Sequence, residues 1–237
     1  MRGLYAIVDT TLLAGRRIDP ILFAGAILQV RPAALQLRAK DLPSRETLGM
    51  MRAIGPMCRR AGVPLVANDR PDLAVLAGCD WVHVGQTDMP IGSVRRIAPS
   101  LGVGVSTHNL AELAEALAAR PAYVAYGPVF ETSTKKNPEP VVGMSGLRAA
   151  RALAAAAGVP LVAIGGITSA RAAEMVGLVD SIAVIADLLP PLPPGDTAPA
   201  SLAEALREVT ARARALHELF VPPAFVASVP PAAKKAR

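Results

Sequence analysis

The chain of 237 residues has few aromatic side chains, 3% of the total, although 52% of its residues are hydrophobic. A core with so few rings must be built from Ala, Val, Leu and Ile, which fill buried parallel strands and the helices that cover them. The composition therefore indicates an α/β protein. The length suits one substantial core, and we expect a single catalytic domain over residues 1–220.

Cysteine is also scarce, and no long apolar run is present. Cys58 and Cys79 lack the spacing of a metal site, and a chain of this size needs no disulfide, so we expect two buried thiols. No apolar run reaches membrane-spanning length, and the apolar run after Met1 is too short for a signal peptide. We expect a soluble, cytoplasmic protein with no membrane partner.

The positive charge is unevenly distributed. The formal net charge is +6, and Lys234, Lys235 and Arg237 supply half of it. The body has no dense run of Lys and Arg interleaved with aromatics, which argues against nucleic acid as a partner and favours phosphorylated small molecules. We expect residues 221–237 to be a disordered Pro/Ala-rich basic tail, with a weak nucleic-acid or membrane arm as the alternative.

Short β-rich segments alternate with Ala/Leu-rich helical segments along the chain. About eight strand-helix units in fewer than 240 residues predict a (β/α)8 TIM barrel. A doubly wound open sheet is the alternative, but it would have fewer strands and a glycine fingerprint after the first, where this chain has Asp9-Thr10-Thr11. The expected strands cover residues 4–9, 34–38, 64–68, 81–84, 102–106, 123–126, 160–164 and 181–185.

Two segments fall outside this repeat. Residues 127–144 are longer than an ordinary strand-helix connection, and their Thr, Ser and Lys content predicts a lid. Residues 190–199 contain too many prolines for a regular helix, and we expect a last helix over residues 201–219.

Three long polar side chains alternate at the end of the second expected strand. Gln36, Arg38 and Lys40 share one face, because side chains point to opposite faces in turn. In a barrel this face meets the active-site mouth, where Arg and Lys suit phosphate oxygens. A half-exposed amphipathic strand would give the same alternation and stays open as the alternative.

Two carboxylates follow the third and fourth expected strands. Asp69 and Asp88 would stand on neighbouring strands about 5 Å apart, close enough to share one cation. Oxygen ligands of this kind suit Mg²⁺, which also keeps positions for water and substrate phosphate. The alternative is that both residues cap the following helices. We expect Asp72 to be the cap in the first loop, which leaves Asp69 for the metal.

The remaining strand ends carry hydroxyl groups and glycines. The stretch from Ser106 to Asn109 fits a hydroxyl donor to a substrate followed by an ordinary Asn cap of the next helix, and is ambiguous without its context. We expect His83 to be a packed, hydrogen-bonded core histidine. Paired glycines at Gly165-Gly166 would let the backbone approach a phosphate after the seventh strand.

Several of these motifs occur together and in order. They are Gln36-x-Arg38-x-Lys40, Asn68-Asp69, Gly85-Gln86-x-Asp88, Ser106, Gly127-Pro128-Val129-Phe130, Thr132-Ser133-Thr134-Lys135 and Ile164-Gly165-Gly166-Ile167. With this combination, residues 4–188 resemble the thiamine-phosphate synthase family.

The resemblance implies a (β/α)8 barrel that joins 4-amino-2-methyl-5-hydroxymethylpyrimidine diphosphate to a thiazole phosphate, or to its carboxylate, and releases pyrophosphate. It implies that Asp69 and Asp88 bind Mg²⁺, and that Arg38, Lys40 and Lys135 neutralise charge on the leaving group. Departure of pyrophosphate before attack would need no general base or covalent nucleophile, which agrees with the lack of a triad. The pyrimidine diphosphate would be held by Gln36, Arg38, Lys40, Asn68, Ser106 and Lys135, and the thiazole phosphate by Thr132, Ser133, Thr134, Gly165 and the backbone at Ile185 and Ala186.

The chain departs from the family pattern at Ala186, where a serine is usual, and at Trp81, where a glycine is usual. The nearest alternative function is that of a thiazole tautomerase, but that family is expected to carry a histidine in the loop where this chain has Pro128. A non-catalytic thiazole-phosphate-binding protein on the same barrel is another alternative. A phosphosugar isomerase would need an acid/base pair that the sequence does not offer. The expected partners are small-molecule substrates, and a homodimer is an open alternative.

Overall fold

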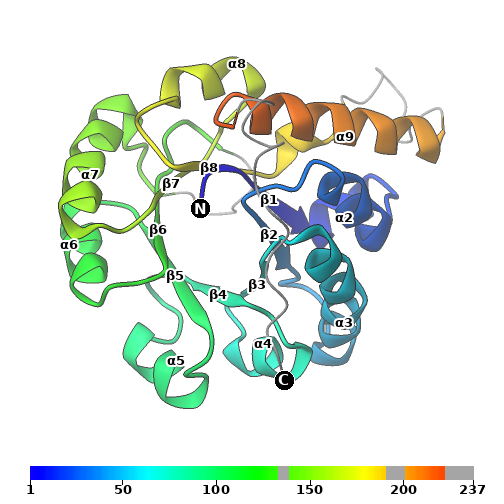
Figure 1. Cartoon of the computed structure of the whole chain (residues 1–237), viewed down its shortest axis with the longest axis horizontal. Helices are drawn as coiled ribbons and strands as arrows, with labels where there is room; N and C mark the ends of the chain where they lie inside the picture. The colour runs from blue at the N-terminus through cyan, green and yellow to red at the C-terminus, as the bar shows by residue number, and fades with distance from the viewer. Residues whose placement is uncertain (133–138, 191–200, 222–237) are drawn as a thin grey trace.

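Eight parallel strands close into one barrel in sequence order, β1 to β8, in the computed structural model (Figure 1). The structure describes residues 1–132, 139–190 and 201–221. The predicted (β/α)8 fold is therefore confirmed, and each predicted strand is present to within two residues. The strands are β1 Gly3–Asp9, β2 Ala34–Arg38, β3 Leu65–Asn68, β4 Trp81–Val84, β5 Gly102–Thr107, β6 Tyr123–Tyr126, β7 Leu161–Ile164 and β8 Ser181–Val184.

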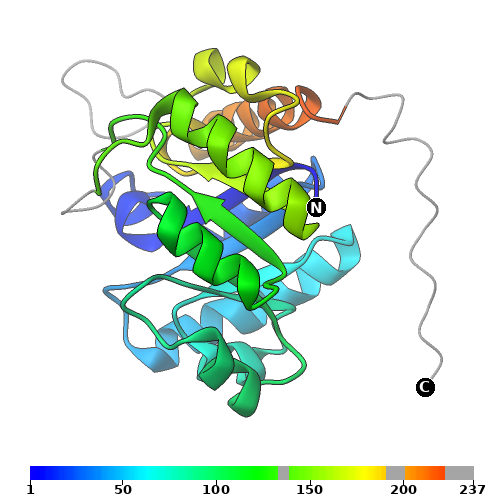
Figure 2. The ribbon, with the colours of Figure 1, turned by 90° about the vertical axis from the view of Figure 1, so that its left-hand side faces the viewer.

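Helices surround the barrel on the outside, and α9 lies between α2 and α8 (Figures 1 and 2). Most connections from one strand to the next include one helix, as parallel strands require. The helices are α1 Thr10–Gly15, α2 Pro20–Leu28, α3 Ser44–Ala61, α4 Pro71–Ala77, α5 Ile91–Ile97, α6 Leu110–Ala118, α7 Gly143–Ala157, α8 Ser169–Ala172 and α9 Leu202–Glu218, with 3₁₀ turns η1 Ala173–Met175 and η2 Ala186–Leu188.

Side-chain caps fix where several helices begin. Asn109 accepts a hydrogen bond from the Glu112 amide at the start of α6, as predicted, and Ser201 accepts one from the Glu204 amide at the start of α9. The prediction for Asp72 is wrong. It lies inside the first turn of α4 and pairs with Arg70, which is the N-terminal flanking residue and makes no side-chain cap.

The rings of Tyr5, Trp81 and Tyr123 gather inside the barrel, where two glycines of β5 make room for Trp81 and Tyr123. A Cβ atom on Gly104 would lie 2.0 Å from the Tyr123 ring, and one on Gly102 would lie 2.3 Å from the Trp81 ring. Trp81 is tilted against Tyr123 with ring centroids 5.7 Å apart. The larger residue at position 81 is thus accommodated by packing over β5 inside the barrel.

The prediction of two buried thiols is confirmed, whereas several predicted segments lie largely outside the described residues. Cys58 and Cys79 are buried free thiols, and burial raises the pKa of each to about 12. No helix in the described ranges combines the length and apolar character needed to cross a membrane. Most of the predicted proline-rich segment and nearly all of the predicted tail lie outside the described residues, as does part of the predicted lid.

Candidate active site

A cavity of about 490 Å³ opens at the carboxyl ends of the strands. Ser133, Thr134 and Lys135 of the predicted site lie outside the described residues. The structure brings the other predicted site residues together around this cavity. They are Gln36, Arg38, Lys40, Asn68, Asp69, Asp88, Ser106, Thr132, Gly165, Ile185 and Ala186.

The polar face of β2 rises from the barrel interior into the cavity. Gln36 is buried, whereas the side chain of Arg38 is 17% exposed and that of Lys40 is 50% exposed. The buried Nε2 of Gln36 has no hydrogen-bond partner within the described parts of the chain. Because an unpaired buried polar group is costly, this atom is a ready donor for a ligand in the cavity.

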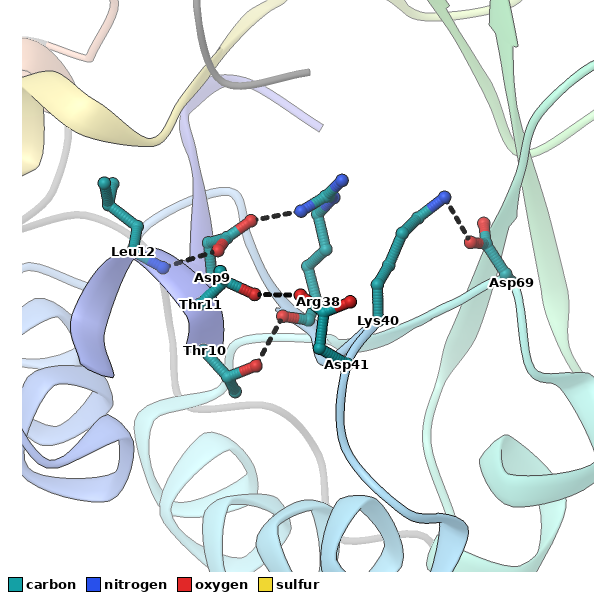
Figure 3. A network of polar contacts seen from close by, with 8 residues as sticks. All are labelled: Asp9, Thr10, Thr11, Leu12, Arg38, Lys40, Asp41 and Asp69. Carbon is teal, nitrogen blue, oxygen red and sulfur yellow. Dashed lines mark hydrogen bonds and ion pairs between the residues drawn. The ribbon is translucent and has the colours of Figure 1, made fainter. Parts of the chain in front are cut away.

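Arg38 is held by an acidic residue that the sequence analysis did not select. The guanidinium donates to the carboxylate of Asp9, which stands opposite Arg38 in the register of β1 and β2 (Figure 3). The other oxygen of Asp9 accepts a hydrogen bond from the Leu12 amide at 3.0 Å and caps α1. One carboxylate therefore fixes both the arginine and the first helix turn.

Lys40 and Asp69 form an ion pair at the mouth of the barrel, with 3.1 Å between Nζ and Oδ2 (Figure 3). Asp69 follows β3 with a φ of 61°, a left-handed conformation that Asp and Asn tolerate better than most residues. Its amide donates to the His83 carbonyl at 2.8 Å, which joins it to the neighbouring strand. The backbone thus holds Asp69 beside the end of β4.

The two predicted metal ligands lie near each other. Burial raises the pKa of Asp69, the Lys40 ammonium lowers it, and the neighbouring Asp88 carboxylate raises it further. Asp88 accepts a hydrogen bond from the Gly85 amide at 2.7 Å and does not cap α5, whose N-terminal flanking residue is Pro90. Within the described ranges, no cluster of three or more His, Cys, Asp or Glu side chains is arranged to hold a metal. The donor set nevertheless fits Mg²⁺, because this ion commonly takes one or two carboxylates.

His83 belongs to the cavity wall, although sequence reasoning assigned it only to the core. Its Nε2 lies 2.7 Å from the Ser106 hydroxyl and its Nδ1 lies 2.9 Å from the Tyr123 hydroxyl. The expectation of a buried, hydrogen-bonded histidine is confirmed. Its alternation with Trp81 and Gly85 placed it on the inward face and could have revealed its contact with the cavity.

A glycine corner forms the opposite wall. Gly165 and Gly166 have φ values of +98° and +62°, and a Cβ atom on either would collide with the segment that follows β6. Ile185 and Ala186 line the cavity beyond the end of β8, in and just before η2. The loops after β7 and β8 of a barrel are common phosphate-binding positions, so this corner suits a second phosphate.

Two charged residues that line the cavity near the glycine corner, Arg171 and Asp187, were not predicted from the sequence. Arg171 donates to the Gly166 carbonyl at 2.9 Å and lies over the Phe130 ring, 4.6 Å from its centroid. Asp187 accepts from the Ser169 amide at 2.8 Å, the first amide of α8. These residues lie in or beside short helical turns, where the sequence offers no alternation to mark an inward face.

Comparisons of the sequence with known proteins identify one family. A family profile described as "Thiamine monophosphate synthase" matches residues 4–188. The chain is 36% identical to the thiamine-phosphate synthase of Chloroflexus aurantiacus over 188 residues, 77% of this chain and 83% of that protein. It is 43% identical to that of Koribacter versatilis over 194 residues, 78% of this chain and 88% of that protein. A solved structure of thiamine phosphate pyrophosphorylase from Pyrococcus furiosus superposes with a TM-score of 0.71 at 30% identity, covering 90% of this chain and 96% of that one.

Proposed function

Because the chain belongs to the thiamine monophosphate synthase family, whose curated relatives are transferases, we propose that it is a magnesium-dependent thiamine-phosphate synthase. Its substrates are 4-amino-2-methyl-5-hydroxymethylpyrimidine diphosphate and a thiazole phosphate or its carboxylate. The products are thiamine phosphate and pyrophosphate. Both substrates are phosphorylated small molecules, and the proposal includes a cytoplasmic location.

One observation carries the proposal. The two carboxylates of Asp69 and Asp88 share a cavity with the cations of Arg38 and Lys40. A diphosphate needs both kinds of group, because carboxylates hold the metal that accompanies it and cations bind its remaining oxygens. This arrangement is suited to stabilising a diphosphate as it leaves.

The chain's own residues then divide the work on the pyrimidine diphosphate. Mg²⁺ held by Asp69 and Asp88 would supply positive charge at the diphosphate oxygens. Arg38, kept in place by Asp9, donates to the oxygens that gain charge as the bond to the pyrimidine methylene breaks. Lys40 shares this charge. Gln36, Asn68 and Ser106 orient the same substrate, and Lys135 is proposed as a further cation. The bond breaks without proton removal from carbon, so no general base is required.

The glycine corner is proposed to hold the thiazole phosphate. Gly165, Ile185 and Ala186 line the cavity, and their backbone amides are proposed as donors to this phosphate. Loss of the usual serine hydroxyl at position 186 would leave that backbone contribution intact. Thr132 adds a hydroxyl, and Ser133 and Thr134 are proposed to do the same. The two phosphates would then occupy opposite walls, with the reacting atoms between them.

Product analysis tests the proposal. Purified protein is mixed with both precursors, with either one omitted, and with or without Mg²⁺, and thiamine phosphate and pyrophosphate are quantified. We expect equal amounts of both products only in the complete mixture with Mg²⁺. No product under any condition would overturn the synthase proposal, and tight thiazole-phosphate binding without turnover would identify a binding protein.

A second measurement separates a catalytic aspartate from a structural one. Asp88→Ala should depress turnover at least a hundredfold while changing thiazole-phosphate affinity less than threefold, because the substitution removes charge from the diphosphate end. Asp72→Ala is the matched control, since Asp72 is an exposed acid on α4 outside the cavity lining. Equal loss of turnover and affinity in Asp88→Ala would mean that this residue is structural.

A further inference from the structure

A chain of hydrogen bonds runs through the barrel interior to the cavity. The Tyr5 and Tyr123 hydroxyls lie 2.7 Å apart, Tyr123 lies 2.9 Å from His83 Nδ1, and His83 Nε2 lies 2.7 Å from Ser106 Oγ. The four residues come from β1, β6, β4 and β5, so closure of the barrel brings them together. Ser106 and His83 line the cavity, and the two tyrosines lie below it.

Packing fixes the members of this chain. Tyr5 is 2% exposed and Tyr123 is fully buried, with the missing side chain of Gly104 leaving the space that the Tyr123 ring fills. The His83 ring stacks on the Tyr123 ring at 5.6 Å between centroids and 17° between planes. The imidazole is thereby held with one nitrogen facing Tyr123 and the other facing Ser106.

Tyr5, at the buried end of this chain of hydrogen bonds, determines which group donates and which accepts in each bond. Burial raises the pKa of both tyrosines, so both hydroxyls keep their hydrogens. The Tyr5 hydroxyl has one hydrogen-bond partner among the described residues, the Tyr123 hydroxyl. If Ser106 donated to His83 and the order ran inward, the Tyr5 hydroxyl would hold a buried hydrogen without an acceptor among the described residues, which is energetically unfavourable.

The opposite order gives every hydrogen an acceptor. Tyr5 donates to Tyr123, Tyr123 donates to His83 Nδ1, and His83 donates from Nε2 to Ser106. Ser106 then accepts inside the protein, and its own hydroxyl hydrogen is left for an acceptor in the cavity. Such chains also polarise each bond along their length.

We propose that Tyr5 and Tyr123 are positioning residues that hold His83 in the tautomer with its hydrogen on Nε2, and so make the Ser106 hydroxyl a donor toward the ligand. The matching ligand atom is an acceptor, a diphosphate oxygen or a pyrimidine ring nitrogen. The identity of that ligand rests on the proposed function, but the tautomer of His83 does not.

Nuclear magnetic resonance of ¹⁵N-labelled protein without substrates tests the tautomer directly. The chain has three histidines, and His83→Gln identifies the signals of His83 by their loss. We expect long-range ¹H–¹⁵N spectra at pH 7.5 to show His83 protonated at Nε2 and bare at Nδ1. Tyr123→Phe should replace this single form by a mixture. Protonation at Nδ1 in the unmodified protein would overturn the proposal, whether or not the protein is a synthase.

Kinetics test the consequence for Ser106. Tyr123→Phe should raise KM for the pyrimidine diphosphate about fivefold to tenfold, since one hydrogen bond is weakened, with KM for the thiazole phosphate within twofold. Tyr126→Phe is the matched control, because Tyr126 lies on the same strand, is buried, and packs outside the barrel against α7. Tyr5→Phe serves as the second variant and should act in the same direction more weakly. An unchanged KM in both variants, or a rise as large in Tyr126→Phe, would refute the positioning role.

Discussion

Asp9 on β1 pairs with Arg38 directly opposite it on β2, and the same carboxylate caps α1 through the Leu12 amide. The acid is almost fully buried, while the guanidinium reaches the cavity. Arg38 is therefore oriented before any ligand arrives, and a ligand need not pay the entropy of ordering it. The pair couples the fold of the first strand-helix unit to the proposed diphosphate site.

Replacing Asp9 by Asn should weaken binding of the pyrimidine diphosphate and leave the cap of α1 in place. In Asp9→Asn the amide still caps α1, but the charge that orients Arg38 is gone, so we expect KM for the pyrimidine diphosphate to rise about tenfold. Asp9→Ala should also lower the free energy of unfolding by about 1 kcal/mol through the lost cap. Asp19→Asn, at the cap of α2, is the control. An unchanged or lower KM in Asp9→Asn would show that Asp9 does not position Arg38.

The glycine under the Tyr123 ring should tolerate no side chain. We expect Gly104→Ala to destabilise the protein by about 1–3 kcal/mol, because the added methyl group meets the ring and the core cannot expand freely. Gly92→Ala on α5 meets nothing within 4 Å and should be neutral or stabilising by up to about 1 kcal/mol. Urea unfolding of both variants makes the comparison. Equal stabilities would contradict the packing described for β5.

His217 should make stability depend on pH. Its Nδ1 accepts from the Leu4 amide at 3.3 Å, and burial lowers its pKa below the ordinary 6.5, with Glu218 opposing the shift. As pH falls through about 6.5 the unfolded chain takes up a proton before the folded one, so the free energy of unfolding declines until the pH is below the folded-state pKa. Above 6.5 this contribution is constant.

Urea unfolding at pH 7.5, 6.0 and 5.0 measures this dependence. His217→Gln should be less stable at pH 7.5, yet lose less stability between pH 7.5 and 5.0 than the unmodified protein. His108→Gln is the control histidine, since its ring lies at the cavity and not against β1. The same loss of stability in the unmodified protein and in His217→Gln would rule out His217 as the source.

The barrel could be predicted from sequence because its signal is local and repeated. Each strand is a short apolar run followed by polar residues. Because the strands are parallel, these polar residues meet at the same end of the barrel. Asp69 and Asp88 could be paired for this reason, as could Gln36 with Arg38 by alternation. The links between Tyr5, Tyr123 and His83 could not, because they join β1, β6 and β4 across the interior and depend on barrel closure.

The prediction that Asp72 caps α4 failed because a cap depends on local geometry that the sequence does not specify. Asp is common both as a cap and inside a first helical turn, and the sequence does not fix which amide lies within reach. In the folded chain the adjacent Arg70 takes the carboxylate. Arg171 was missed because α8 has four residues, too few for a helical pattern to mark the face toward Gly166.

Asp69 and Asp88 are proposed to hold the Mg²⁺ that turnover needs. The most direct test measures the initial rate of thiamine phosphate formation after chelation with EDTA and then during titration with Mg²⁺, for the unmodified protein, Asp69→Asn, Asp88→Asn and the exposed-site control Asp72→Asn. Asn retains the left-handed backbone of Asp69, so that variant tests charge and not folding. We predict no rate without Mg²⁺, full recovery in the unmodified protein and in Asp72→Asn, and at least a hundredfold lower rate in the other two. A full rate in EDTA, or normal recovery in both Asp69→Asn and Asp88→Asn, would show that these two carboxylates do not hold a metal that turnover needs.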